Sequence, residues 1–233
     1  ALQRELPVCR SDLYITTKLP PTPDRSVMAQ WIDESLERLQ LDYIDCLAIH
    51  GINTQAHLDW VKDGCYQAVA DAIACGKVRH VGFSTHGSLE LILATIETQL
   101  FEFINLLYYY FFQPLAPAIE LAHKYDLGIF IISPADKGGK LYTPPPNLEH
   151  LCHPLTPLAF NYRWLLADDR ISTLSLGAAN PDELYPSLDL ADDNYPLTTT
   201  ELGIIAALEQ QLQVTLNTDL CSQCYACLPC PAQ

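Results

Sequence analysis

Four of the nine cysteines of this chain lie close together near its carboxyl end, in the pattern Cys221-x2-Cys224-x2-Cys227-x2-Cys230-Pro231. Cysteines at every third position of a tight loop can present several thiolates to one small volume. A cubane iron–sulfur cluster needs such an arrangement, because each of its irons takes a thiolate from a different side, and a proline often follows the last cysteine of these ligand runs. The spacing therefore favours a [4Fe-4S] cluster held by these cysteines.

Other interpretations of the cysteine run remain open. Structural zinc usually pairs two C-x2-C knuckles across a longer spacer or adds histidine ligands, and this run has neither feature. Redox-active or unligated thiols are a further alternative. Disulfides fit poorly, because the total is odd and the remaining cysteines lie singly, mostly among apolar residues; they are Cys9, Cys46, Cys65, Cys75 and Cys152.

Composition limits the classes of partner. The chain has 233 residues, of which 49% are hydrophobic, and its 28 acidic against 13 basic residues give a formal net charge of −15. We therefore expect neither nucleic acid nor a membrane surface as a partner, since both carry negative charge. No apolar run reaches the roughly 18 residues of a spanning helix, and the start of the chain lacks a secretion signal pattern. Free cysteines without such a signal indicate the cytoplasm.

Short apolar runs alternate with longer segments of helical period, a pattern typical of βα units around a parallel sheet. Helices are expected at Arg25 to Leu39, Asp59 to Cys75, Leu115 to Tyr125 and Thr199 to Leu212. Strands are expected at Leu13 to Thr17, Ile44 to Ile49, Val78 to Ser84, Phe103 to Leu107, Ile129 to Ser133 and Thr173 to Leu176. The prediction is an α/β fold with about six βα units.

Glycines and prolines divide the chain further. Gly76, Gly87 and Gly128 stand where helices are expected to stop in a left-handed conformation. The proline-rich stretch from Lys140 to Pro157 is expected to be a loop. We expect one barrel-like domain over residues 1–218 and a separate cysteine-rich segment over 219–233. The first residues look like the end of a helix running into Pro7, so the chain is expected to start inside a fold.

Polar residues end three successive strands of this pattern. Lys18 ends the first, His50 the second and Ser84 the third. In a βα barrel the carboxyl ends of the strands form the active-site face, so these three side chains are expected to converge there. A single lysine or histidine in such a place is more often structural, but equivalent positions in successive units favour a catalytic role.

These residues resemble the aldo/keto reductases. The likeness covers roughly Ala1 to Leu190 and rests on several motifs in the same order and spacing; they include Tyr14-Ile-Thr-Thr-Lys18, Tyr43-Ile-Asp45-x4-His50, Gly76-Lys-Val-Arg79-x2-Gly82-Phe-Ser84, Ile132-Ser-Pro134-x3-Gly138-Gly139 and Leu176-Gly177-Ala-Ala-Asn180-Pro181. The cysteine run resembles a branch of that family with a ferredoxin-like [4Fe-4S] extension.

The resemblance implies a TIM-type (β/α)8 barrel, incomplete here, that reduces a small carbonyl compound with hydride from NAD(P)H. It makes Lys18 the lysine that lowers the pKa of a catalytic tyrosine, and His50 the histidine that orients the carbonyl. Ser84 and Asn105 match positions that hold the nicotinamide amide. Gly177 and Asn180 lie where the family grips the phosphate and adenosine end of the cofactor, on a loop leading into a helix amino terminus.

This sequence also departs from the family pattern. The family's catalytic tyrosine and aspartate lie upstream of the lysine strand, so we expect this piece to be inactive alone. Gly177 stands where the family often has a lysine for the 2′-phosphate, and Ile132 where it often stacks a tyrosine on the nicotinamide. Weak cofactor binding with little preference for the 2′-phosphate follows. The resemblance also assigns Cys230 to a second cluster.

The sequence thus predicts an NAD(P)H-dependent carbonyl reductase with an iron–sulfur segment. The alternative is a non-catalytic barrel scaffold or electron-transfer protein whose cysteine segment docks a redox partner protein. An upstream aspartate and tyrosine would favour the enzyme, and their replacement would favour the scaffold. No motif identifies the substrate, because the loops that select it, including Lys140 to Pro157, carry none.

Overall fold

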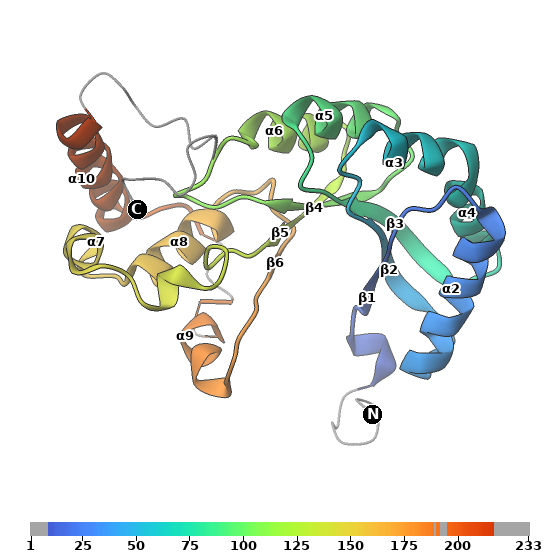
Figure 1. The fold of residues 1–233 in the computed structure, drawn as a ribbon. Helices are drawn as coiled ribbons and strands as arrows, with labels where there is room; N and C mark the ends of the chain where they lie inside the picture. Colours follow the sequence, from blue (N-terminus) through green and yellow to red (C-terminus); the bar gives the residue numbers. More distant parts are fainter. Residues whose placement is uncertain (1–8, 189, 192–194, 217–233) are drawn as a thin grey trace. The chain divides into compact units, whose positions relative to one another are not determined.

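The computed structural model describes residues 9–188, 190–191 and 195–216, and it shows alternating strands and helices (Figure 1). The chain divides into two compact units. The first contains the residues up to Leu106 together with Ala118–Ile129, and the second contains Leu107–Pro117 and the residues from Phe130 onward. The described part has six strands: β1 (Thr16–Leu19), β2 (Ile44–His50), β3 (Val78–Ser84), β4 (Phe103–Leu107), β5 (Gly128–Ile132) and β6 (Thr173–Ser175).

The first unit is built on four strands in sequence order, β1-β2-β3-β4, and each neighbouring pair is parallel. The connections are helical, as parallel pairing requires. Figure 1 shows these helices alongside the strands, and α2 packs against both β1 and α4. They are α2 (Arg25–Leu39), α3 (Gln55–Trp60), the π-helical turn η2 (Val61–Cys65), α4 (Tyr66–Ala74), α5 (Leu89–Glu97) and α6 (Ala116–Lys124).

Helix α2 spans the residues that the sequence predicts. The Asp24 carboxylate accepts a hydrogen bond from the Ser26 amide (2.7 Å) and caps the first turn. Met28, Ile32 and Leu36 recur at helical spacing and are buried. The helix ends at Gln40, which adopts the left-handed conformation. Capping and periodicity therefore agree on both ends of this helix.

The predicted helix over Asp59 to Cys75 is interrupted by the π-helical turn. Gly64 lies within this turn and faces the chain just before α2. A side chain at this position would place its Cβ 2.6 Å from the Pro23 carbonyl oxygen, which is far inside van der Waals contact. The close approach of the two backbones explains why glycine occupies this position.

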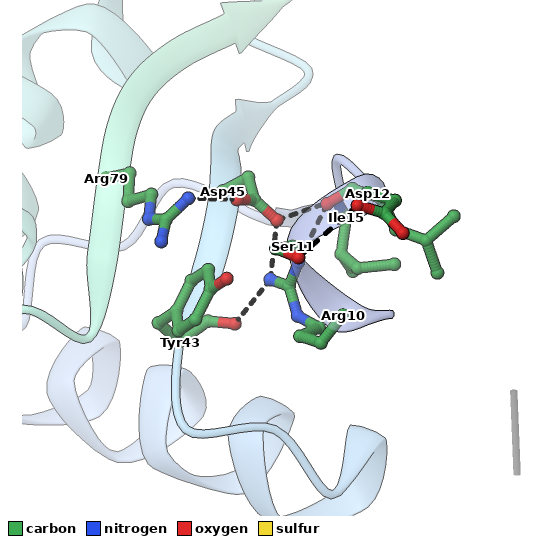
Figure 2. A network of polar contacts seen from close by, with 8 residues as sticks. Arg10, Ser11, Asp12, Ile15, Tyr43, Asp45 and Arg79 are labelled. Carbon is green, nitrogen blue, oxygen red and sulfur yellow. Dashed lines mark hydrogen bonds and ion pairs between the residues drawn. The ribbon is translucent and has the colours of Figure 1, made fainter. Parts of the chain in front are cut away.

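A buried carboxylate ties the start of the chain to β2 and β3. The Asp45 side chain is 1% exposed and accepts hydrogen bonds from Arg10 (2.5 Å), Arg79 (3.0 Å) and the Ile15 amide (2.8 Å). Figure 2 shows the two guanidinium groups on either side of Tyr43, 4.0 and 3.8 Å from its ring centroid. This network lies at the amino ends of the strands, where barrel residues usually serve stability.

The second unit pairs β5 with β6 in parallel and adds the elements around them. Its core cluster contains Cys152, Phe160, Ile204 and Leu208, and the partly buried Tyr110 packs against it. Its helical elements are η3 (Lys140–Tyr142), α7 (Pro146–Cys152), α8 (Pro157–Leu166), η4 (Pro181–Glu183), α9 (Tyr185–Leu188) and α10 (Thr199–Leu216).

A buried ion pair fastens α10 to α8. Arg163 on α8 donates from Nε to Glu201 on α10 (2.8 Å), and both side chains are almost fully buried. The second oxygen of Glu201 accepts from the Thr198 amide (2.6 Å) and hydroxyl (2.8 Å), so the same carboxylate caps the helix. The Arg163 guanidinium also lies over the Tyr195 ring, 3.9 Å from its centroid.

Some sequence expectations were wrong in detail. The first strand runs from Thr16 to Leu19, because the Ile15 amide is held by the Asp45 carboxylate and Tyr14 is 80% exposed. The expected loop over Lys140 to Pro157 contains η3 and α7, since Pro146 stands at a helix start, where its fixed φ is compatible.

The left-handed helix stops also differ from expectation. Gly76 has the predicted positive φ, but the positions after the neighbouring helices are taken by other residues: Gln40, Gln99 and Asp126. Neither Gly87 nor Gly128 has a positive φ; Gly128 is the first residue of β5.

The predicted cysteine-rich segment, 219–233, lies outside the described residues. Its boundary and its four cysteines, Cys221, Cys224, Cys227 and Cys230, therefore stay predictions. Among the residues that are described, no helix is long and apolar enough to cross a bilayer.

Candidate functional site

Three of the predicted site residues lie in one row across the first unit. His50 on β2 is in register with Ser84 on β3, and Ser84 is in register with Asn105 on β4. Residues in register on neighbouring parallel strands point to the same face and stand about 4.8 Å apart. His50 and Ser84 are the last residues of their strands, so the row marks the carboxyl edge of the sheet.

Lys18 shares this face from the neighbouring strand. It pairs with Ala48, which lies two residues before His50 and therefore points to the same side of β2. Lys18 is half-buried, and burial lowers the pKa of its ammonium group. It is the third residue of β1 rather than the residue that follows it, because the strand is shifted toward the carboxyl end.

A second row of residues in register lies next to the first, toward the amino ends of the strands. This second row consists of Lys18, Ala48, Gly82 and Phe103. On β2, β3 and β4 its members lie two residues before His50, Ser84 and Asn105. A Cβ on Gly82 would lie 2.5 Å from the Phe103 ring, so the ring fills the space that a side chain would need. This close packing explains why position 82 is glycine.

The end of β2 is held against the end of β3. The Ser84 carbonyl accepts from the amides of Gly51 (2.8 Å) and Ile52 (3.0 Å), and the Ser84 hydroxyl also accepts from the Gly51 amide (3.2 Å). Gly51 has a φ of 77°, a conformation that glycine adopts without strain. The chain thus turns immediately after His50, and the exposed histidine stays at the mouth of the row.

Asn105 carries an unused hydrogen-bond donor. Its side chain is buried, and none of the described residues accepts a hydrogen bond from its Nδ2 atom. An unpaired buried amide costs free energy, so this donor needs a partner that is not among the described residues. A ligand carbonyl, such as that of a carboxamide, would satisfy it.

A second candidate site lies in the second unit. A pocket of about 590 Å³ is lined by the loops after β5 and β6, residues 132–143 and 175–183. We call it the β5–β6 pocket. Gly177 lines it, whereas Asn180 stands beside it in the same loop. Its volume lies in the range of ligand sites.

Backbone forms much of the wall of the β5–β6 pocket. Gly138, Gly139 and Gly177 line it without side chains, so a ligand can approach the main chain there. The Tyr142 hydroxyl donates to the Gly177 carbonyl (3.2 Å) and connects the two loops. The predicted helix amino terminus after Asn180 is only the three-residue turn η4.

Two acidic residues that line this pocket were not predicted from the sequence. Asp136 and Glu183 both line it, and no lysine or arginine of the described part of the chain does. The signal was present, because Asp182 and Glu183 follow directly after the Asn180-Pro181 motif. Asp136 accepts a hydrogen bond from the Tyr109 hydroxyl (2.7 Å).

No group of three or more histidine, cysteine or acidic side chains within 9–188, 190–191 and 195–216 is arranged to hold a metal ion. The cysteines of the described part are free, and Cys46, Cys65 and Cys152 are buried. Burial raises the pKa of each of these three thiols, that of Cys152 to about 11. These cysteines are therefore protonated and unreactive at neutral pH.

The chain matches a known protein family over most of its length. A family model described as the aldo/keto reductase family matches residues 1–210. The chain belongs to the aldo/keto reductase family. Members of this family are oxidoreductases.

Individual aldo-keto reductases are similar over most of the chain. AKR2E4 of Bombyx mori is 29% identical over 168 residues, which make up 67% of this chain and 53% of that protein. An aldo-keto reductase of Mycolicibacterium smegmatis is 26% identical over 205 residues, 86% of this chain and 69% of the relative. The chain thus spans about half of the first relative.

Solved aldo-keto reductases share the fold. The holo form of AKR11C1 from Bacillus halodurans matches with a TM-score of 0.73 and 20% identity, over 88% of this chain and 75% of that one. An aldo-keto reductase from Klebsiella pneumoniae in complex with NADPH matches with a TM-score of 0.66 and 18% identity, over 85% and 70%. The predicted TIM-type α/β barrel fold, incomplete in this chain, is confirmed.

Proposed function

We propose that this chain is part of an aldo/keto reductase that reduces a small carbonyl compound with hydride from NAD(P)H. The row of His50, Ser84 and Asn105, with Lys18 on the same face, is the observation that carries this proposal. It brings together four polar groups from four strands at one edge of the sheet. The family resemblance assigns carbonyl reduction with hydride from NAD(P)H to these positions.

Lys18 and His50 would prepare the carbonyl for reduction. A half-buried ammonium acts through a less polar medium than water, so it lowers the pKa of a nearby phenol more strongly. His50 at the exposed end of the row is free to contact a substrate carbonyl. The resemblance assigns the phenol and its partner carboxylate to no residue of this chain, and we propose that the 233 residues alone transfer no hydride.

The two ends of the cofactor are assigned separately, the nicotinamide to residues of the first unit and the adenosine end to residues of the second. Asn105 Nδ2 would donate to the carboxamide oxygen of a nicotinamide, and the Ser84 hydroxyl would support the same group. The glycine-lined wall of the β5–β6 pocket, including Gly177, would accept the phosphate and adenosine end, with Asn180 shaping its loop. The bound nicotinamide supplies the hydride. The NADPH complex of the Klebsiella pneumoniae relative supports this assignment.

Replacing Asn105 by leucine tests the proposal. In the full-length product of the gene, wild-type protein should oxidise NADH or NADPH only when an aldehyde is added. Asn105→Leu should raise the KM and the Kd for the cofactor about tenfold, because one hydrogen bond is lost. The free energy of unfolding should stay unchanged or rise by up to about 1 kcal/mol, because an unpaired buried amide is removed.

Asn161 provides the matched control. It is also fully buried, but its Oδ1 accepts from the Tyr110 amide (2.9 Å) and its Nδ2 donates to the Pro134 carbonyl (2.7 Å). Asn161→Leu should therefore cost about 2–4 kcal/mol of stability in a urea titration. If Asn105→Leu destabilises equally and leaves cofactor binding unchanged, Asn105 is structural and the proposed site is wrong.

We also propose an iron–sulfur cluster in the carboxyl-terminal segment, with Cys221, Cys224 and Cys227 as ligands. Cys230 would serve a different cluster or remain unpaired, since a proline directly after a residue disfavours the helical conformation for it. The main support is the cysteine spacing. The described cysteines elsewhere in the chain are free thiols. Such a segment could exchange electrons with a redox partner protein. Buried free thiols also favour a reducing compartment, the cytoplasm.

Replacing Cys224 by alanine should abolish the cluster. The full-length protein, reconstituted anaerobically with iron and sulfide, should show the broad visible absorption of a [4Fe-4S] centre, and Cys224→Ala should remove it. Cys152→Ala is the control, because this buried thiol lies in α7, within the second unit's core cluster, and should leave the absorption unchanged. Stoichiometric zinc without iron or sulfide in the anaerobically purified protein would contradict the assignment.

A further inference from the structure

The charge of the β5–β6 pocket points to the form of cofactor that it accepts. We propose that Glu183 makes this pocket select NADH and reject the 2′-phosphate of NADPH. The inference rests on the proposed function, because it concerns the same cofactor site. The sequence expectation of little preference for the 2′-phosphate considered Gly177 but not Glu183, which also lines the pocket. We therefore replace it by a preference for the cofactor without this phosphate.

Glu183 is fixed at the pocket wall by its own loop. Its Oε2 accepts a hydrogen bond from the Ala179 amide (2.7 Å), and its Oε1 accepts from the Asn180 side-chain amide (3.0 Å). Asn180 in turn accepts from the Glu183 amide (3.3 Å). This ring of hydrogen bonds fixes the direction of the carboxylate at the pocket wall, which Gly177 also lines.

The charge of this carboxylate is not neutralised. Both of its hydrogen-bond donors are neutral amides, and no ion pair to Glu183 occurs within the described residues. The second carboxylate of the pocket, Asp136, adds to the negative potential. A phosphate monoester brought into this pocket would meet two like charges and no cation from the wall.

The free ribose of NADH suits the same wall. A carboxylate accepts hydrogen bonds from a ribose 2′-hydroxyl, and acidic residues serve this purpose in NAD-binding sites of other folds. A 2′-phosphate, by contrast, is usually held by arginine or lysine. Repulsion between two like charges about 4 Å apart changes binding affinity on the order of tenfold or more.

Two lysines near the pocket do not change this preference. Lys137 and Lys140 belong to the loop after β5, but both are exposed and neither lines the pocket. The cofactor phosphates common to both forms are the group that such exposed lysines would attract. The pyrophosphate is common to NADH and NADPH, so this contact would raise both affinities and leave their ratio unchanged.

Binding measurements on the whole chain test the proposal without any turnover. NADH and NADPH are titrated by fluorescence, and 5′-AMP and adenosine 2′,5′-bisphosphate by calorimetry. Each pair differs only in the 2′-phosphate. The wild-type chain should bind the member without this phosphate on the order of tenfold more tightly.

Glu183→Gln should bring the two affinities of each pair within about threefold, since it removes the charge and keeps the shape. Asp182→Asn is the matched control. It removes the same charge one residue earlier, at an exposed position that does not line the pocket, and should leave the ratio unchanged.

The remaining outcomes separate this inference from the proposed function. Equal or tighter binding of NADPH by the wild-type chain overturns the inference but leaves a nicotinamide enzyme. An unchanged ratio in Glu183→Gln shows that another group sets the preference, which also overturns it. No binding of any of the four compounds overturns both the inference and the proposed cofactor site.

Discussion

Asp45→Ala is expected to lower the free energy of unfolding by about 3–5 kcal/mol, because it removes one partner of a buried ion pair and strands the other. The carboxylate binds Arg10, Arg79 and the Ile15 amide together (Figure 2). Without it, the partly buried Arg10 guanidinium loses its counter-charge. The chain before β1 loses the bond that fixes where the strand starts.

Asp33→Ala is the control for this change. Asp33 also forms an ion pair, with Lys77 at 2.6 Å, but both side chains are about half exposed. Exposed pairs contribute about 0–1 kcal/mol, so this variant should unfold close to wild type. Urea titration followed by circular dichroism measures both variants. An equally small decrease in the free energy of unfolding of both variants would show that Asp45 contributes no more than a surface charge.

Arg163→Met should destabilise the second unit by about 3–5 kcal/mol at pH 7, because Glu201 is left as an unpaired buried carboxylate. The double variant Arg163→Met with Glu201→Gln should recover much of the loss, since a neutral amide costs less to bury and still accepts from Thr198. Arg170→Met, which affects a more exposed pair with Asp168, is the control.

The pH dependence of these variants has a defined sign. Burial raises the pKa of Glu201, but hydrogen bonds from Thr198 and Arg163 outweigh it and hold the pKa below its usual value. The wild-type contribution is therefore present above about pH 4.3 and is lost as the pH falls through the lowered pKa. In Arg163→Met burial dominates and the pKa rises. The difference in free energy of unfolding between wild type and Arg163→Met should therefore be smaller at pH 5 than at pH 7. An equal difference at both pH values would contradict this role of Glu201.

Hydrophobic pattern and strand-end polarity were enough to predict most of the fold and one row of the site. The strands over Val78–Ser84 and Phe103–Leu107 have the predicted bounds. Phe103–Leu107 is buried throughout, as is typical of a parallel strand covered on both faces. His50 and Ser84 end their strands as expected. The catalytic roles of these residues remain predictions.

What the sequence could not supply are interactions between distant residues. Nothing in the local pattern links Arg10 to Asp45, so the first strand was expected too early. Proline count alone suggested a loop where Pro146 begins α7, because a proline at a helix start and one in a loop look the same in sequence. Glu183 was missed because its role depends on where the loop folds back, through Ala179 and Asn180.

The aromatic run that opens the second unit has a consequence for synthesis of the chain. The rings of Tyr110 and Phe111 contact the Phe160 ring and pack against the core cluster that includes Ile204 of α10. These partners leave the ribosome much later than the aromatic run. At about 5–20 residues per second, the run waits on the order of 5–20 s before its partners emerge. During that interval its rings are exposed to other nascent chains. This stretch is therefore where a chaperone would be needed, and where aggregation of an interrupted chain would begin.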